Sequence, residues 1–237
     1  MKKHEGCPLG KYICPKFDVM TLDENQGLSF LEEQVRRHMG ADGSGHDWFH
    51  IERVVRNALH LAEMAHADKR ICQAAALLHD LPDPKLNSSG EKIWEVIQSW
   101  LQTAGFTTIE KERVISIIKQ CHFEGGGSRH QPDSQEAAVV IDADRLDAIG
   151  AIGIARAFAY GGSRHRPIYD PTQPPRPEMT REEYRQANSH TINHFYEKLL
   201  LLKERMHTEG GRRLAEERHR FMEIFLQQFF REWNGEV

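Results

Sequence analysis

The sequence predicts an all-α protein, folded as a single compact multi-helix domain with a long C-terminal helical hairpin. Apolar residues recur every three to four positions through most of the chain, which is the spacing of one face of a helix. The alternation of apolar and polar residues that is typical of strands is scarce. With 237 residues and 39% hydrophobic content, the chain can bury one substantial core and needs no second domain.

The N-terminal segment differs from the rest of the chain. Residues 1–26 contain scattered proline, glycine and cysteine and show no sustained periodicity, so they are predicted to form a tail or an arm. The domain is then expected over 27–237, with the helical pattern established from Phe30. The four cysteines show no paired spacing, which favours reduced thiols over disulfides.

Further helices are predicted between clear breaks in the apolar pattern. Their expected ranges are 69–80, 91–104, 108–122, 134–160, 180–207 and 209–232. Thr107 with Glu110, and Thr180 with Glu183, place a hydroxyl and a carboxyl three residues apart, and such capping boxes start helices. The last two helices form the predicted hairpin. The proline-rich loop 161–177 is long enough to act as a lid.

Charge and hydropathy restrict the partners. The formal net charge of −4 argues against a nucleic-acid partner, while a small anionic substrate stays possible. No run of about 18 apolar residues occurs, so a membrane partner is not expected either. The protein is predicted to be soluble and cytoplasmic, and it could be a monomer or a homodimer.

Histidines and carboxylates recur beside three separate apolar helical stretches. The three clusters are His46-Asp47-Trp48-Phe49-His50, His79-Asp80 and Asp142-Ala143-Asp144-Arg145-Leu146-Asp147. A buried carboxylate costs free energy that a bound cation offsets. Mixed imidazole and carboxylate ligands therefore indicate a metal site, and a hydrolytic one is the natural use for it. Asp47 is better placed to cap a helix start than to bind metal.

The order of these residues resembles that of the HD-domain superfamily of metal-dependent phosphohydrolases. That superfamily has a histidine, then an adjacent His-Asp pair, then a distant aspartate. The corresponding residues here are His50, His79, Asp80 and Asp144. The resemblance implies an all-helical HD-domain fold in which these four residues bind one divalent metal ion.

A narrower resemblance covers about residues 28–233. It rests on three motifs, which are His46-Asp47-x-x-His50-x-x-Arg53-Val54, Asp142-Ala143-Asp144-Arg145-Leu146-Asp147-Ala148-Ile149-Gly150-Ala151-Ile152-Gly153 and His194-Phe195-x-x-Lys198-Leu199-Leu200. These motifs are similar to those of a small bacterial group within the superfamily, the YedJ/YpgQ-like proteins. This resemblance implies hydrolysis of phosphate esters or anhydrides in nucleotides.

The implied ligands suit a divalent transition metal, with manganese favoured and cobalt, nickel, iron or zinc as alternatives. Asp80 is accordingly a predicted catalytic residue as well as a ligand. Asp83 is a second predicted catalytic residue, because it could orient water or accept its proton. Asp83 could equally just form a turn between two prolines.

Substrate contacts are predicted for basic residues near the motifs, namely His46, Arg53, Lys85, His122, Arg145, His194 and Lys198. Such side chains can neutralise or orient a phosphate. Structural alternatives stay open for most of them. These are a surface or capping role for His46, solvation for Lys85, a helix-end cation for His122, an ion pair for Arg145, and helix packing for His194 beside an exposed Lys198.

The metal-site residues, taken with what the resemblance implies, predict a divalent-metal-dependent phosphohydrolase that acts on nucleotides. The leading reaction is cleavage of a nucleoside or deoxynucleoside triphosphate to the monophosphate and pyrophosphate. One alternative is a nucleoside monophosphate phosphatase, which would release orthophosphate instead. Another is a nucleotide-sensing HD module with little turnover, which would bind a nucleotide and release no product.

Overall fold

The structure, a computed structural model, describes residues 23–39, 47–83, 91–121, 131–176 and 189–237. Within these ranges every regular element is helical and none is a strand, which confirms the all-α prediction. The elements in chain order are α1 (Glu24–Met39), α2 (Trp48–Ala65), α3 (Lys69–Leu78), α4 (Glu91–Thr103), α5 (Thr108–Cys121), α6 (Gln135–Asp147), α7 (Gly150–Ser163), α9 (Thr191–Glu197), the 3-10 helices η2 (Leu199–Leu201) and η3 (Lys203–Arg205), and α10 (Glu209–Trp233). The predicted tail 1–26 lies almost wholly outside the described residues.

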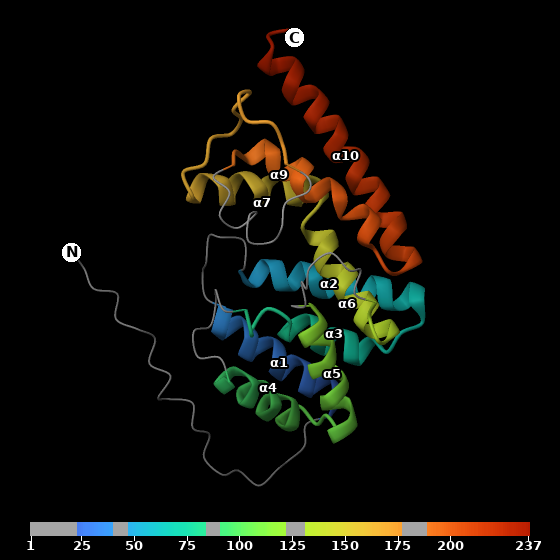
Figure 1. Cartoon of the computed structure of the whole chain (residues 1–237). Coiled ribbons are helices and arrows are strands. Elements are labelled where there is room, and N and C mark those ends of the chain that lie inside the picture. Colours follow the sequence, from blue (N-terminus) through green and yellow to red (C-terminus); the bar gives the residue numbers. More distant parts are fainter. Residues whose placement is uncertain (1–22, 40–46, 84–90, 122–130, 177–188) are drawn as a thin grey trace, which may run out of the picture.

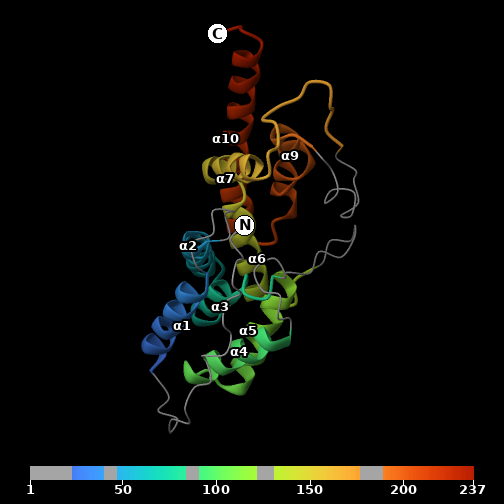
Figure 2. The same ribbon diagram turned by 90° about the vertical axis from the view of Figure 1, so that its left-hand side faces the viewer.

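The helices form an elongated molecule with its centre at α2, α3 and α6 (Figure 1). These three helices pack against one another, and α1 and α5 also pack against α3. At the other end, α10 packs along α7 and also touches α6 and α2. The view from the side shows the same order, with α1, α4 and α5 at one end and the C-terminus of α10 at the other (Figure 2).

The central helices are the most apolar part of the core. In α3, the consecutive residues Ala74, Ala75 and Ala76 are fully buried, because their small side chains let neighbouring helices approach on several sides. In α2, the buried stripe runs through His50, Val54 and other residues at three- to four-residue spacing. A histidine therefore occupies a core position, which places its ring inside the molecule.

Side-chain caps define several helix starts as the sequence predicts. The Thr107–Glu110 capping box is confirmed, because the Glu110 amide donates to Thr107 Oγ1 at 3.3 Å and the Thr107 amide donates to Glu110 Oε2 at 2.7 Å. The capping role of Asp47 is confirmed as well, because Asp47 Oδ1 accepts from the His50 amide at 2.9 Å. The second predicted box, Thr180 with Glu183, lies outside the described residues.

The predicted helix 134–160 is wrong, because the structure divides it into α6 and α7. The break lies at Ile149, which is extended, and at Gly150, whose φ of 76° is in the left-handed region. A side chain at position 150 would also meet Arg218, with an added Cβ only 3.0 Å from Arg218 Cβ. The apolar spacing continues across the break, which is why the pattern alone suggests one helix.

Replacing Gly150 with alanine is expected to destabilise the protein by about 1 kcal/mol or more, because an L side chain is strained at this φ. Gly162→Ala is the matched control. Gly162 lies inside α7 with open space around it, so alanine there should stabilise by about 0.5–1 kcal/mol. Urea unfolding of both variants measures the difference, and changes of the same sign would contradict this account of the break.

The predicted helix 180–207 is also wrong in its described part, which contains α9 and two 3-10 helices. The chain leaves the helical conformation at Lys198, where φ is −141° and ψ is −59°. Buried side chains nevertheless keep a three- to four-residue spacing across the break, at Phe195, Leu199, Leu202 and Met206. The second helix of the predicted hairpin, α10, forms as expected.

The loop that was predicted as a possible lid packs against α9 and α10 over its described residues. The amides of Thr191 and Ile192 donate to the carbonyls of Pro167 and Ile168 at 3.0 and 3.1 Å. The ring of Tyr169 lies against several aromatic rings, including that of Trp233 at 5.0 Å between centroids. A lid role for this loop stays a prediction.

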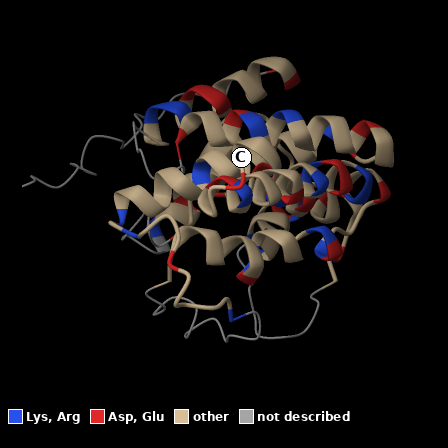
Figure 3. Cartoon of the chain, turned by 90° about the horizontal axis from the view of Figure 1, so that it is seen from above, with Lys and Arg blue, Asp and Glu red and all other residues tan. Residues whose placement is uncertain are grey.

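Lysine, arginine, aspartate and glutamate alternate along the helices (Figure 3). Most of the described residues of these types are exposed or partly exposed, as expected for amphipathic helices around one core. Among the described residues, no helix combines the length and the apolar content that crossing a membrane requires.

Candidate metal centre

Three buried polar residues meet where α2 and α3 cross. His50 lies in the first turn of α2, His79 directly follows α3, and Asp80 is the next residue. One ligand atom from each lies within 4.8 Å of the others. All three side chains are buried in the core, with His50 and His79 each 1% exposed and Asp80 6% exposed. We call these three residues the His-His-Asp group.

The distances show that two Nε2 atoms and the carboxylate face one point. His50 Nε2 lies 3.3 Å from Asp80 Oδ2, and His79 Nε2 lies 3.5 Å from Asp80 Oδ1. Asp144, on α6, completes the arrangement from a third helix. Its Oδ1 lies 3.5 Å from His50 Nε2 and 3.8 Å from His79 Nε2. The side chain of Asp144 is 41% exposed, so the group opens to solvent on this side.

The second nitrogen of each histidine is held by an acceptor. His79 Nδ1 lies 2.8 Å from the carbonyl oxygen of Ala76, and His50 Nδ1 lies 2.8 Å from Asp147 Oδ2. A carbonyl or a carboxylate can only accept a hydrogen bond, so these two contacts favour a proton on Nδ1 in each ring. Arg156 Nη1, which can only donate, also lies 3.2 Å from His50 Nδ1, but it has a closer acceptor in Asp147 Oδ2 at 2.6 Å. In the neutral ring, Nε2 then presents its lone pair, and this is the tautomer that a metal ion requires.

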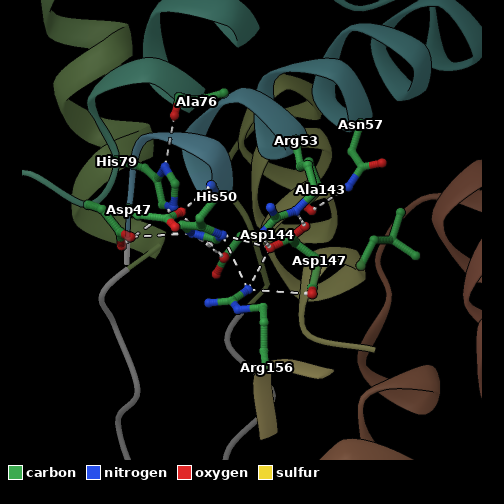
Figure 4. Close-up of polar contacts among 12 residues, drawn as sticks. Asp47, His50, Arg53, Asn57, Ala76, His79, Ala143, Asp144, Asp147 and Arg156 are labelled. Carbon is green, nitrogen blue, oxygen red and sulfur yellow. Dashed lines mark hydrogen bonds and ion pairs between the residues drawn. The ribbon is translucent and has the colours of Figure 1, made fainter. Parts of the chain in front are cut away.

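Asp147 connects His50 to two arginines. Its carboxylate accepts from Arg53 Nε at 2.6 Å, from Arg53 Nη2 at 3.0 Å and from Arg156 Nη1 at 2.6 Å. In Figure 4, His50 lies between His79 on one side and Asp147 on the other. Because Asp144 and Asp147 are one turn apart on α6, one helix supplies a carboxylate to each nitrogen of the His50 ring.

The pKa values show how strongly the charges interact. Burial lowers the pKa of His79, but the carboxylates of Asp80 and Asp144 outweigh this effect and raise it to about 9. Burial raises the pKa of Asp144, but the two imidazoles together have the larger effect and lower it to about 2. Asp147 is also held well below its usual pKa range, because His50 and Arg53 outweigh its burial. The carboxylates of Asp144 and Asp147 therefore stay ionised throughout the physiological range.

Comparison with known proteins places this site in a family. Residues 48–149 match the HD domain. The chain is 38% identical over 208 residues to YpgQ of Bacillus subtilis, and the match covers 86% of this chain and 94% of YpgQ. The chain belongs to the HD-domain family. It is accordingly a metal-dependent phosphohydrolase in the general sense, and the His-His-Asp group can hold a divalent metal ion.

Solved structures of HD-family proteins agree with this assignment. An HD-superfamily hydrolase from Bacillus thuringiensis is 41% identical with a TM-score of 0.72, and the match covers 89% of this chain and 98% of that one. The crystal structure of Bacillus subtilis YpgQ in complex with ADP is 35% identical with a TM-score of 0.71 and covers 89% and 97% of the two chains.

Two of the predicted site residues close to the HD motifs have other described contacts. Arg53 binds Asp147 through two nitrogens. Asp83 lies in the turn that follows the His-Asp pair, and its amide donates to the carbonyl of Asp80 at 3.0 Å. Substrate contact for Arg53 and catalysis by Asp83 stay predictions.

For the other described candidates, the contacts seen in the structure are with groups outside the His-His-Asp group. Arg145 Nη1 contacts the carbonyl of Arg205 and lies 2.9 Å from His207 Nε2, so this side chain faces the segment before α10. His194 and Lys198 lie on and just after α9, which packs against α7. Burial lowers the pKa of His194 to about 3, and the charges of Lys198 and Arg166 lower it as well.

Three predicted substrate contacts, His46, Lys85 and His122, lie outside the described residues. Conversely, the sequence prediction missed Arg156 and gave Asp147 no specific role. The sequence feature that could have pointed to Arg156 is its position as a single arginine in an apolar run, from Ala151 to Phe158. Its contact with Asp147 depends on the break at Gly150, which the prediction also missed.

Proposed function

We propose that this chain hydrolyses nucleoside or deoxynucleoside triphosphates to monophosphates and pyrophosphate, at one divalent ion held by His50, His79, Asp80 and Asp144. The observation that carries the proposal is the convergence of two imidazole Nε2 atoms and two carboxylates, with both Nδ1 atoms already bound to acceptors. This donor set fits a transition metal better than calcium, and manganese is the first choice.

The residues of this chain have distinct roles in the proposed reaction. A divalent ion held there would supply an acidified water as the nucleophile and would polarise a phosphoryl oxygen. Asp147 keeps the His50 ring in one orientation and one tautomer. The exposed side of Asp144 leaves a path for a substrate. Support for a nucleotide comes from YpgQ, whose crystal structure contains ADP.

The test is hydrolysis of a nucleotide panel by metal-stripped protein that is resupplied separately with manganese, cobalt, nickel, magnesium or zinc. We expect metal-dependent release of pyrophosphate, which Asp144→Ala abolishes. Asp133→Ala is the control, because Asp133 is exposed and contacts Ser116. Release of orthophosphate would replace the proposal with a phosphatase. Binding of nucleotides without any product would replace it with a nucleotide sensor.

The affinity for metal is expected to rise with pH. In the metal-free protein the pKa of His79 is raised to about 9, so this ring is protonated at pH 7 and must lose its proton to bind a metal. We expect binding of Mn²⁺ at pH 7 to release about one proton or more, and the affinity to rise about tenfold per pH unit until the pH passes the pKa of His79. Calorimetric titrations in buffers of different ionisation enthalpy measure the proton release. An affinity that is constant between pH 7 and pH 9 would contradict the raised pKa of His79 in the metal-free protein.

A further inference from the structure

A pocket lies beside the His-His-Asp group, between α2, the start of α7 and α10. Its volume is about 450 Å³, and its walls include Arg53, Arg56, Arg218, Ile152 and Phe221. None of the four proposed metal ligands lines it. We call it the arginine pocket.

Arg218 is the pocket arginine whose described hydrogen bonds go only to neutral groups, although the charges of Asp147 and Glu217 also act on it. Its Nη2 donates to Asn57 Oδ1 at 3.2 Å, and its Nη1 donates to the carbonyl of Leu146. Both acceptors are neutral, and within the described part of the chain no carboxylate oxygen lies in ion-pair distance of this guanidinium. A cation that is held in place by neutral acceptors keeps its charge available for an anion.

The other two arginines add to this charge. Arg56 binds Glu52 at 2.8 Å, but Arg56 is 68% exposed, so solvent screens this ion pair. Arg53 binds Asp147, whose charge is shared with Arg156 and His50. The other acidic residue of the wall, Glu217, is exposed on α10. The walls therefore carry three arginines against two carboxylates, and one of these carboxylates, Asp147, also binds Arg156 and His50.

The backbone at the start of α7 has the same polarity. The N-cap residue, Ile149, has no side chain that can accept from the first amides of the helix. Residues 149–152 all line the pocket, and Gly150 lets the stem of Arg218 pass close to the helix start. Amides at a helix start attract anions and add to the charge of the three arginines.

The remaining wall is apolar and accessible. Phe221 is 49% exposed and Ile152 is 44% exposed, and both line the pocket. A large aromatic side chain at the edge of a basic pocket can stack on a planar ring. A volume of this size suits a small organic ligand rather than a simple ion.

We propose that the arginine pocket is a second binding site, separate from the metal centre, for a phosphate-bearing ligand with a planar ring, which is the chemistry of a nucleotide. The arginines and the α7 amides bind the phosphate, and the ring lies against Phe221 and Ile152. The proposal does not depend on the proposed reaction, because no proposed metal ligand takes part in it.

The test is equilibrium dialysis of radiolabelled ADP against metal-stripped, full-length Asp144→Ala protein, so that no metal ion is present to bind the nucleotide. We expect about one ADP per chain, and we expect Arg56→Glu or Phe221→Ser, each added to Asp144→Ala, to weaken binding about tenfold or more. Arg37→Glu is the matched control, because Arg37 is similarly exposed and also binds a glutamate four residues earlier, on α1. It should leave binding unchanged.

Three results would overturn the proposal. The first is Asp144→Ala protein that binds no ADP, or binds it equally well with and without the two pocket substitutions. The second is inorganic phosphate that displaces ADP at equal concentration, which would make this a site for the anion alone. The third is a wild-type dimer that Arg56→Glu dissociates in sedimentation, which would show that a second copy covers the pocket. Loss of hydrolysis in the nucleotide panel, with ADP still bound to Asp144→Ala, would instead remove only the proposed function.

Discussion

Replacing Asp80 with alanine is expected to abolish hydrolysis and to weaken binding of Mn²⁺ by more than about a hundredfold, while the helical content of the protein stays nearly unchanged. Asp80 faces both histidines, at 3.3 Å from His50 Nε2 and 3.5 Å from His79 Nε2. Loss of a residue that only orients a ligand already costs about 10–100-fold in metal affinity, so loss of a direct ligand should cost more. The fold should persist because Asp80 follows the end of α3, so the substitution lies outside the helix.

Titration of metal-stripped protein with Mn²⁺, followed by electron paramagnetic resonance, measures the affinity, and circular dichroism measures the helical content. Asp80→Asn keeps the size of the side chain and should show the same loss of metal. Asp133→Asn is the control, because Asp133 is an exposed aspartate that contacts Ser116 and does not belong to the His-His-Asp group. Asp80→Ala protein that binds Mn²⁺ like the wild type would contradict the proposed site. A large loss of helix would show that Asp80 has a structural role instead.

The four proposed ligands are implied by the resemblance to the HD-domain superfamily, and each also lies at a position that local rules define. His50 follows the N-cap Asp47 by three residues, and His79-Asp80 directly follows the apolar run that forms α3. Asp144 lies in a helix whose apolar residues are evident from their spacing. These rules use only residues that are close in the chain, and they also predict most helix bounds to within a few residues.

The surroundings of the ligands could not be predicted in the same way. The contact of Arg156 with Asp147 requires α7 to fold back at Gly150, and apolar spacing is continuous through that break. The same limit hides the end of α9 at Lys198. Periodicity reports which side chains are buried, and it does not report a turn that keeps the same side chains buried on both sides of it.

Replacing Asp147 with asparagine is expected to weaken binding of Mn²⁺ by about 10–100-fold and to destabilise the metal-free protein by about 2–3 kcal/mol. The amide cannot neutralise Arg53 and Arg156, and it no longer holds His50 as a strong acceptor. Removing one partner of a fully buried ion pair costs about 3–5 kcal/mol. The cost should be lower here because the two arginine side chains are 28% and 23% exposed, so water can solvate them.

Asp144→Asn separates the two effects. Asp144 faces the same histidine from one turn earlier on α6, but its side chain is far more exposed than that of Asp147. We expect Asp144→Asn to lower the metal affinity with a smaller loss of stability. Equal stability losses in the two variants would contradict the role of Asp147 as the buried partner of two arginines.

The loss of stability in Asp147→Asn is expected to depend on pH, in a direction that follows from the lowered pKa of Asp147. His50 and the arginines outweigh the burial of Asp147 and hold its pKa well below the usual value of an aspartate, about 3.9. A carboxylate whose pKa is lower in the folded state contributes stability that is fully present above the unfolded-state pKa and is lost as the pH falls through the folded-state pKa. The difference in unfolding free energy between wild type and Asp147→Asn should therefore be constant between about pH 5 and pH 7 and should shrink only below about pH 4. Urea unfolding of the metal-free proteins at several pH values measures this difference. A difference that already shrinks between pH 7 and pH 5 would show that a titrating histidine, and not the carboxylate of Asp147, sets the stability of this cluster.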